Sequence, residues 1–331
     1  MSFTWGEKRA SKILVGLPPK QPFQLLPSFR ERVWGRESLA PYFPEVQGAK
    51  RIGEAWFSFE ENPTSLGGTL GELIAAHPTI LGTSSNDKHA AICPLLVKLL
   101  FTTERLSVQV HPGDEYARHH HNCLGKTEAW YVIDAEPSGE IAIGFRESIT
   151  PDRLRASALN GEIENLLNWR KVSAGDVILT PAGTVHAIVA GVTICEIQQN
   201  SDITYRLYDY GRPRELHLEH GVQVSHLGPY NHHQEKVILS EGREQLAACE
   251  YFRIERLRPV DAITVGGGLP HYLLLVSIKA SGSIAGSGYA PGQTWMAPAG
   301  AAEFTIAGGD SEWLLTYAAN EPLDAAAVRL T

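Results

Sequence analysis

Polar side chains that could bind a metal alternate with apolar ones along residues 106–112 and again along residues 126–131. Successive side chains of an extended strand point to opposite faces. Gln109 and His111 therefore share one face of the first segment, and Glu128 lies on one face of the second. An amide oxygen, an imidazole and a carboxylate all bind divalent metals. We expect pairing of the two strands to bring these three side chains around one cation.

A further candidate ligand lies in a repeated pattern. Residues 175–186 and 292–303 each read Gly, five residues, Pro-Ala-Gly, then two residues before a polar side chain, which is His186 in the first copy and Glu303 in the second. The shared turn chemistry predicts two barrels built on one plan. This strand–turn–strand resembles the second conserved motif of cupins, in which the histidine after the turn is a metal ligand. Residues 271–276 carry no Gln-x-His pair, so we expect a metal-free second barrel.

Together the candidate ligands are Gln109, His111, Glu128 and His186. Two imidazoles, one carboxylate and one amide oxygen suit zinc, with manganese, iron or cobalt as substitutes. One carboxylate against a divalent ion leaves the shell positive by about one unit, so the ion could stabilise an oxyanion on a substrate. Lys126 lies on the same strand face as Glu128, beside the proposed site.

The elements that must position these residues are mainly strands. We expect a mainly β fold of two cupin-type jelly-roll barrels, with α-helical inserts at about 66–100 and 150–170. The N-terminal catalytic domain would span 1–235 and the C-terminal domain 236–331. Helix starts are predicted at Thr69, which can form a capping box with Glu72, and at Thr150, which precedes a proline.

The remaining histidines gather in segments that read as solvated surface. Residues 113–125 form a polar stretch with His119, His120 and His121, and we expect a loop there rather than a metal tract. The other members of this group are also predicted to be solvated. They are His217, His220, His232 and His233.

Bulk composition sets limits on the function. The 331 residues are 43% hydrophobic and 20% charged, as in soluble globular proteins. Four scattered cysteines, the absence of a long apolar run and the absence of a signal-like N-terminus favour the reducing cytoplasm. A net charge of −8 argues against nucleic-acid binding but permits a small anionic substrate. We expect a monomer or a weak homo-oligomer without a membrane partner.

Blocks across the chain are similar to those of the type I phosphomannose isomerases in their short bacterial form. The order and spacing of the blocks match from about residue 30 onward. The resemblance implies a zinc enzyme, with one ion per chain, that interconverts mannose 6-phosphate and fructose 6-phosphate through an enediol. The blocks are residues 107–112, 126–131, 181–187, and 196–202 with 204–210.

Carried over residue by residue, the resemblance also implies roles. It assigns the metal ligands named above, catalytic roles for Arg206 and Lys126, and the phosphate end of the site to Lys98 and Ser107. The proton-transfer base stays open among Lys126, Glu196 and a metal-bound water.

Two other functions are compatible with a metal-binding cupin. An iron dioxygenase would keep the metal and change the chemistry, because fold alone does not choose the reaction. A non-catalytic sugar-phosphate-binding protein would use the metal structurally. The basic residues Lys98, Lys126 and Arg206 favour a phosphorylated sugar over a neutral aromatic substrate.

Overall fold

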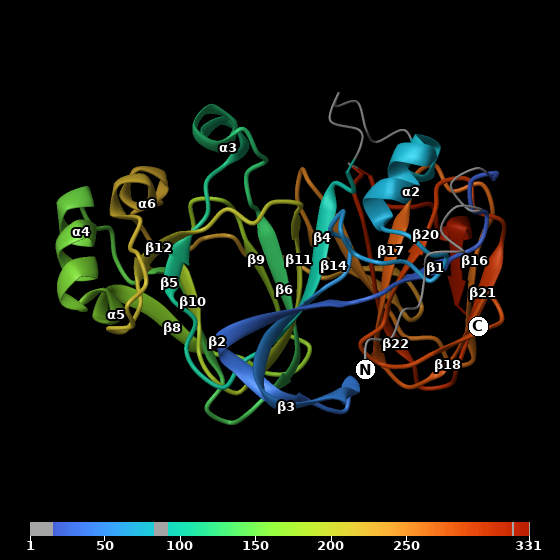
Figure 1. Ribbon diagram of the computed structural model, residues 1–331, viewed down its shortest axis with the longest axis horizontal. Helices are drawn as coiled ribbons and strands as arrows, with labels where there is room; N and C mark the ends of the chain where they lie inside the picture. The colour runs from blue at the N-terminus through green and yellow to red at the C-terminus, as the bar shows by residue number, and fades with distance from the viewer. Residues whose placement is uncertain (1–15, 83–91, 320, 331) are drawn as a thin grey trace.

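The computed structural model describes residues 16–82, 92–319 and 321–330, and in these ranges the strands form four antiparallel sheets (Figure 1). Two of the sheets lie in the N-terminal half. The six-stranded sheet has the order β2 (Ser28–Leu39), β3 (Phe43–Trp56), β4 (Leu95–Phe101), β11 (Val192–Gln199), β6 (Glu128–Ala135), β9 (Val177–Thr180). The five-stranded sheet has the order β12 (Tyr205–Tyr208), β5 (Val108–Val110), β10 (His186–Ile188), β7 (Glu140–Phe145), β8 (Leu167–Lys171).

The other two sheets are formed mostly by the C-terminal half, with one strand from the N-terminus. The seven-stranded sheet has the order β1 (Phe23–Leu25), β20 (Thr294–Ala297), β17 (Leu273–Lys279), β22 (Glu312–Tyr317), β15 (Arg253–Leu257), β14 (Arg243–Ala248), β13 (Val237–Ser240). The second has the order β19 (Ser287–Tyr289), β18 (Gly282–Ile284), β21 (Phe304–Ala307), β16 (Ala262–Val265), β23 (Val328–Leu330). The predicted mainly β, cupin-like fold is confirmed.

Alternation along the strands explains how the two halves pack. On β17, Leu274 and Val276 join a core that also contains residues of the six-stranded sheet, such as Val97. Leu273 and Leu275, which point the other way, join a separate core inside the C-terminal half. The large sheets of the two halves therefore pack face to face through their outer apolar sides, as Figure 1 shows near the middle of the molecule.

Short helices connect some of the strands. Both predicted helix starts are confirmed. Thr69 and Glu72 form the capping box, and the Thr150 side chain accepts the backbone N–H of Arg153. The helices are α2 (Leu70–Ala76), α3 (Asp114–His121), α4 (Pro151–Asn160), α5 (Ile163–Leu166) and α6 (Leu218–Val224), with 3-10 turns η1 (Pro78–Leu81) and η2 (Ala325–Ala327).

The helical inserts are shorter than predicted. Residues 95–100 belong to strand β4, and residues 167–170 belong to strand β8. Every residue of β4 is buried, so the strand lacks the polar–apolar alternation that distinguishes strand from helix in a sequence. Residues 83–91 of the first insert lie outside the described ranges.

The expected polar loop at 113–125 is largely the helix α3. Asp114 and Glu115 in its first turn, and basic residues in its last turn, complement the helix dipole. Asn122 ends the helix in the left-handed conformation. The run of histidines is therefore held on a helix surface.

The Pro-Ala-Gly repeat occupies matching corners of the two halves. Gly183 and Gly300 both have positive φ, 86° and 65°, after strands β9 and β20. Glu128 is opposite Thr180 in the β6–β9 register, and Leu273 is opposite Ala297 in the β17–β20 register. The second half therefore has a buried leucine where the first has its candidate carboxylate ligand.

Candidate active site

The candidate metal ligands come from two sheets that face each other. Gln109 and His186 are cross-strand partners on β5 and β10, whereas Glu128 lies on β6 in the opposing sheet. The prediction that the strands of Gln109 and Glu128 pair with each other was wrong, because β5 pairs with β10 and β12. The predicted faces were correct, so the side chains still meet between the sheets.

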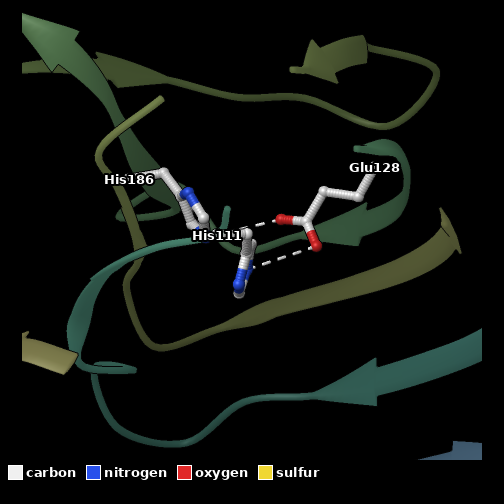
Figure 2. A group of neighbouring side chains, drawn as sticks. All are labelled: His111, Glu128 and His186. Carbon is white, nitrogen blue, oxygen red and sulfur yellow. Dashed lines mark ion pairs between the residues drawn. The ribbon is translucent and has the colours of Figure 1, made fainter. Parts of the chain in front are cut away.

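His111, Glu128 and His186 form a buried cluster whose ligand atoms all lie within 4.8 Å of one another. Glu128 Oε2 lies 3.5 Å from His111 Nε2, and Glu128 Oε1 lies 3.4 Å from His186 Nε2 (Figure 2). Each carboxylate oxygen thus faces one imidazole nitrogen, and the two rings lie 4.8 Å apart. This arrangement surrounds a common point with two nitrogens and a carboxylate.

Backbone carbonyls fix the orientation of both imidazoles. His111 Nδ1 lies 2.8 Å from the carbonyl oxygen of Ile203, and His186 Nδ1 lies 2.9 Å from that of Thr184. Because a carbonyl can only accept, each Nδ1 carries the proton and each Nε2 keeps its lone pair. Burial lowers the pKa of His186 to about 4 and that of His111 well below its usual value, so both rings are neutral. Neutral imidazoles with a fixed tautomer are suited to bind a metal.

The carboxylate of Glu128 also fits a metal. Its side chain is 1% exposed, and Oε1 receives no hydrogen bond from the described residues. Burial raises the pKa of this carboxyl to about 7, against the lowering effect of Lys126. An unpaired buried carboxylate oxygen is costly, and a divalent cation would compensate it. The residues present therefore fit the metal that the sequence predicts.

Gln109 adjoins this cluster but does not present its oxygen to it. Its amide nitrogen donates to His186 Nε2 at 3.2 Å, and its Oε1 accepts from Ser107 Oγ at 3.1 Å. A half-turn of the amide would exchange the two atoms and add an oxygen ligand to the His111–Glu128–His186 cluster.

Lys126 lies directly beside the cluster, as predicted. Its ammonium group is 3.0 Å from Glu128 Oε2 and 3.2 Å from His111 Nε2, and its side chain is buried. Burial acts to lower the pKa of Lys126, but the carboxylates of Glu128 and Glu196 outweigh it and raise the pKa above its ordinary value. Lys126 is thus a charged donor next to the candidate metal position.

A cavity of about 380 Å³ adjoins the cluster and contains most of the remaining predicted residues. Lys98, buried on β4, forms an ion pair with Glu196 at 3.3 Å. Lys98 therefore lies on a buried strand and not on a solvated helix surface. Burial acts to raise the pKa of Glu196, but Lys126 and Lys98 outweigh it and lower the pKa, so the carboxylate is ionised. The predicted residues that line this cavity are Lys98, Ser107, Gln109, Lys126, Glu196 and Arg206.

Arg206 lines the cavity without a carboxylate partner among the described residues. It forms no ion pair with Asp202 or Asp209. Its NH1 donates to the carbonyl oxygen of Glu215, and its buried Nε has no acceptor in the part of the chain that the structure describes. The Asp209 carboxylate instead accepts from Arg212 and from Arg214. Two guanidinium groups therefore share the Asp209 carboxylate, and Arg206 is not one of them. The cavity as a whole is lined by five basic and three acidic side chains, an excess of about two positive charges. The basic ones are Arg32, Lys98, Lys126, Arg206 and Arg214, and the acidic ones are Glu54, Glu196 and Asp202.

Sequence reasoning missed four charged residues that line the cavity. Arg32 forms a bidentate ion pair with Glu54, and Arg214 is held by Asp209. Asp202 lies inside a block that had been singled out, but Arg214 follows Arg206 by eight residues, in a turn-rich segment. The alternating pattern of a strand could not indicate these side chains, because loops or distant strands position them.

Facing antiparallel sheets, a buried His–Glu–His cluster and a basic cavity beside it define a cupin-type protein with a candidate metal centre. Residues 23–150 match the family described as phosphomannose isomerase type I, catalytic domain. The mannose-6-phosphate isomerase ManA of Bacillus subtilis is 36% identical over 313 residues, which cover 87% of this chain and 96% of that protein. The mannose-6-phosphate isomerase of Streptococcus mutans is 34% identical over 276 residues, 78% of this chain and 85% of that protein.

Comparison with solved structures indicates the same family. The crystal structure of the mannose 6-phosphate isomerase from Bacillus subtilis superposes with a TM-score of 0.81 at 29% sequence identity, covering 90% of this chain and 99% of that one. The chain belongs to the type I phosphomannose isomerase family.

Proposed function

We propose that this protein is a mannose-6-phosphate isomerase that interconverts mannose 6-phosphate and fructose 6-phosphate through an enediol. The observation that carries the proposal is the buried cluster of His111, Glu128 and His186 beside a cavity with an excess of basic side chains. The names of the relatives support the same reaction. The basic wall disfavours the neutral aromatic substrate of a dioxygenase.

The proposed metal is one zinc ion, held by His111, Glu128 and His186, with Gln109 as the fourth ligand. Bound zinc would polarise the sugar carbonyl and stabilise the negative charge that develops on its oxygen. None of the four side chains is a cysteine, so the shell differs from the cysteine-rich structural zinc sites.

The phosphate end of the substrate is assigned to one wall of the cavity. Lys98 and Ser107 line it, as the family resemblance implies, and we add Arg214. The Asp209 carboxylate binds Nε and NH2 of Arg214 at 2.6 Å each, which fixes the guanidinium and leaves its remaining donors without a partner among the described residues. Because Arg206 has no carboxylate partner among the described residues, a phosphate dianion would balance the local charge excess.

Proton transfer between carbons 1 and 2 requires a base and stabilised oxygens. We assign the base to Glu196, because its ionised carboxylate lines the cavity and is oriented by Trp130 Nε1 at 3.2 Å. Lys126 is assigned to donate a hydrogen bond to a sugar oxygen near the metal position. Arg206 stays charged throughout and would stabilise the enediolate rather than move a proton.

The cell compartment and assembly state are part of the proposal. In the described ranges, the helices are all too short or too polar to cross a membrane. We propose a cytoplasmic enzyme that acts as a monomer or weak homo-oligomer, with residues 1–235 as the catalytic domain and 236–331 as a metal-free domain.

The test combines metal analysis with a coupled isomerase assay. Protein stripped by a chelator should lose isomerisation of mannose 6-phosphate and regain it with zinc. His186→Ala should lose both bound zinc and turnover, whereas the control His232→Ala, at an exposed histidine, should keep both. Full turnover by zinc-free protein would contradict the metal role. Binding of mannose 6-phosphate without exchange of the carbon 2 proton would favour the non-catalytic alternative.

A further inference from the structure

A second cluster of imidazoles lies on the surface between α3 and α6. The ring centres of His120 and His220 are 5.5 Å apart, as are those of His121 and His220, and those of His120 and His121 are 6.3 Å apart. Two imidazoles bound to one zinc ion at about 2.1 Å have ring centres about 5 Å apart in tetrahedral geometry. The spacing of these three rings, from two helices, is therefore close to what a shared metal requires.

One member of the cluster is already oriented as metal ligands are. Tyr116 donates its hydroxyl proton to Oε1 of Gln223 at 3.0 Å. The Tyr116 oxygen, 2.8 Å from His220 Nδ1, therefore accepts the Nδ1 proton, and His220 Nε2 keeps its lone pair. The ring of Tyr205 stacks on that of His220 at 5.2 Å and an interplanar angle of 15°. This outer hydrogen bond fixes the tautomer and the ring plane, as in known histidine metal sites.

Carboxylates lie near the cluster but do not pair with its imidazoles. Within the described part of the chain, no carboxylate lies within ion-pair distance of His120, His121 or His220. Desolvation and the neighbouring imidazoles lower the pKa of His120. His120 lines an open groove of about 920 Å³, whose charged lining is three carboxylates, of Asp114, Glu115 and Glu250, and one guanidinium, of Arg118. Carboxylates in the groove add a negative field that attracts cations.

We infer that His120, His121 and His220 form a second binding site for a divalent transition metal such as zinc. Among the described residues, only the active-site cluster brings three ligand atoms within 4.8 Å of one another, so the second site requires ring rotations. His120 and His121 are exposed, and exposed side chains change rotamer at small cost. His121 would exchange its 2.6 Å contact with the Tyr205 hydroxyl, or bind through Nδ1.

The site would connect two segments that carry active-site residues. Helix α3 begins three residues after His111, and the chain returns from it to Lys126. On the other side, His217 at the start of α6 binds both the backbone N–H and the backbone carbonyl of Arg206. A metal that bridges α3 and α6 would cross-link these segments, so its binding should raise the melting temperature of the zinc-loaded enzyme.

The experiment measures zinc per chain by equilibrium dialysis, starting from enzyme whose active site is already loaded. The wild type should take up a second, weaker equivalent, and the double variant His120→Ala/His220→Ala should lose it while retaining the first. The matched control His232→Ala/His233→Ala removes two exposed imidazoles elsewhere and should keep the second equivalent.

A further variant tests the orientation of His220 without removing a ligand. Tyr116→Phe deletes the hydroxyl that accepts the Nδ1 proton and should weaken the second site by about 10- to 100-fold. Uptake of only one equivalent by the wild type would overturn the inference. So would a second equivalent that persists in the His120→Ala/His220→Ala variant. Isomerase activity reports separately on the first site, so failure of either proposal is visible on its own.

Discussion

The ammonium group of Lys98 lies 3.3 Å from a carboxylate oxygen of Glu196, and both side chains are almost fully buried. Lys98 also lies 4.5 Å from the centre of the Trp56 ring, and Trp130 donates to the other oxygen of Glu196. The pair is therefore held between two tryptophans on the wall of the active-site cavity. The ion pair fixes the orientation of both side chains. Each buried charge is stabilised by the other, so the loss of one leaves the other unpaired.

Removing one member of this pair should destabilise the protein. Lys98→Met leaves the Glu196 carboxylate buried and unpaired, and we expect a loss of about 3–5 kcal/mol in the free energy of unfolding. The double variant Lys98→Met/Glu196→Gln should recover most of this stability but no isomerase activity. Denaturant unfolding and a coupled assay measure the two effects. Equal stability of the single and double variants would show that the two charges are not coupled.

Arg214 should determine how strongly the enzyme prefers a phosphorylated sugar. Loss of one charge-assisted contact to phosphate costs about 1.5–3 kcal/mol, so Arg214→Met should lower kcat/KM for mannose 6-phosphate by about 10- to 100-fold. Its residual activity on unphosphorylated mannose should not change. The control Arg329→Met removes an exposed arginine of the other half and should leave both values unaltered. An unchanged preference would remove Arg214 from the phosphate site.

Asp209 should make stability depend on acid pH. Burial acts to raise its pKa, but hydrogen bonds from Arg214 and Arg212 outweigh burial and lower it below the ordinary value. Stabilisation by Asp209 is therefore present above about pH 4 and lost as the pH falls through the lowered pKa. Asp209→Asn should be about 2 kcal/mol less stable than the wild type at pH 7. The difference in the free energy of unfolding between the two proteins should shrink by pH 3, as denaturant unfolding curves at pH 7 and pH 3 would measure. A difference that stays constant between the two pH values would contradict the role of Asp209.

The two corner glycines should respond differently to the same substitution. A Cβ at Gly183 would lie 2.1 Å from His226 Cδ2, whereas the nearest atom to a Cβ at Gly300 is the flexible Lys20 Nζ at 3.3 Å. Both positions have positive φ, so alanine costs about 1 kcal/mol at each from the backbone alone. Gly183→Ala should cost more than this.

The zinc affinity provides a second measure of the Gly183 corner. Gly183 donates its N–H to the carbonyl oxygen of His111 at 2.8 Å, so a displaced corner should also move this candidate metal ligand. Gly183→Ala should weaken zinc binding, and Gly300→Ala should not. If Gly183→Ala and Gly300→Ala had equal effects on stability and equal effects on zinc dissociation, His226 would have moved away from the new Cβ without cost.

Local patterns in the sequence predicted much of the site, because strand alternation and turn chemistry are short-range effects. They correctly placed His111 and Glu128 on inward faces, and the repeat located the corner before His186. They failed where the answer depends on which strands become neighbours: Gln109 and Glu128 lie in facing sheets rather than in paired strands. Sheet partners are chosen by long-range packing, which a short segment does not encode.

The same limit explains the remaining errors. Residues 95–100 form a strand buried on both faces, so their apolar run carries no period. Arg214 reaches the cavity because Asp209, itself in a loop, holds its guanidinium. Neither the partner nor the cavity can be recognised before the chain is folded.

Strand β1 connects the two halves of the molecule, because it belongs to the N-terminal half but pairs with a strand of the C-terminal half. Its residues Phe23–Leu25 pair with Thr294–Met296 of β20, so the N-terminal segment forms the outer strand of a sheet otherwise built by the other half. Proteolytic nicking near residue 235 should therefore yield two fragments that stay associated. A C-terminal fragment expressed alone would expose the free edge of β20, which invites intermolecular strand addition and insoluble product.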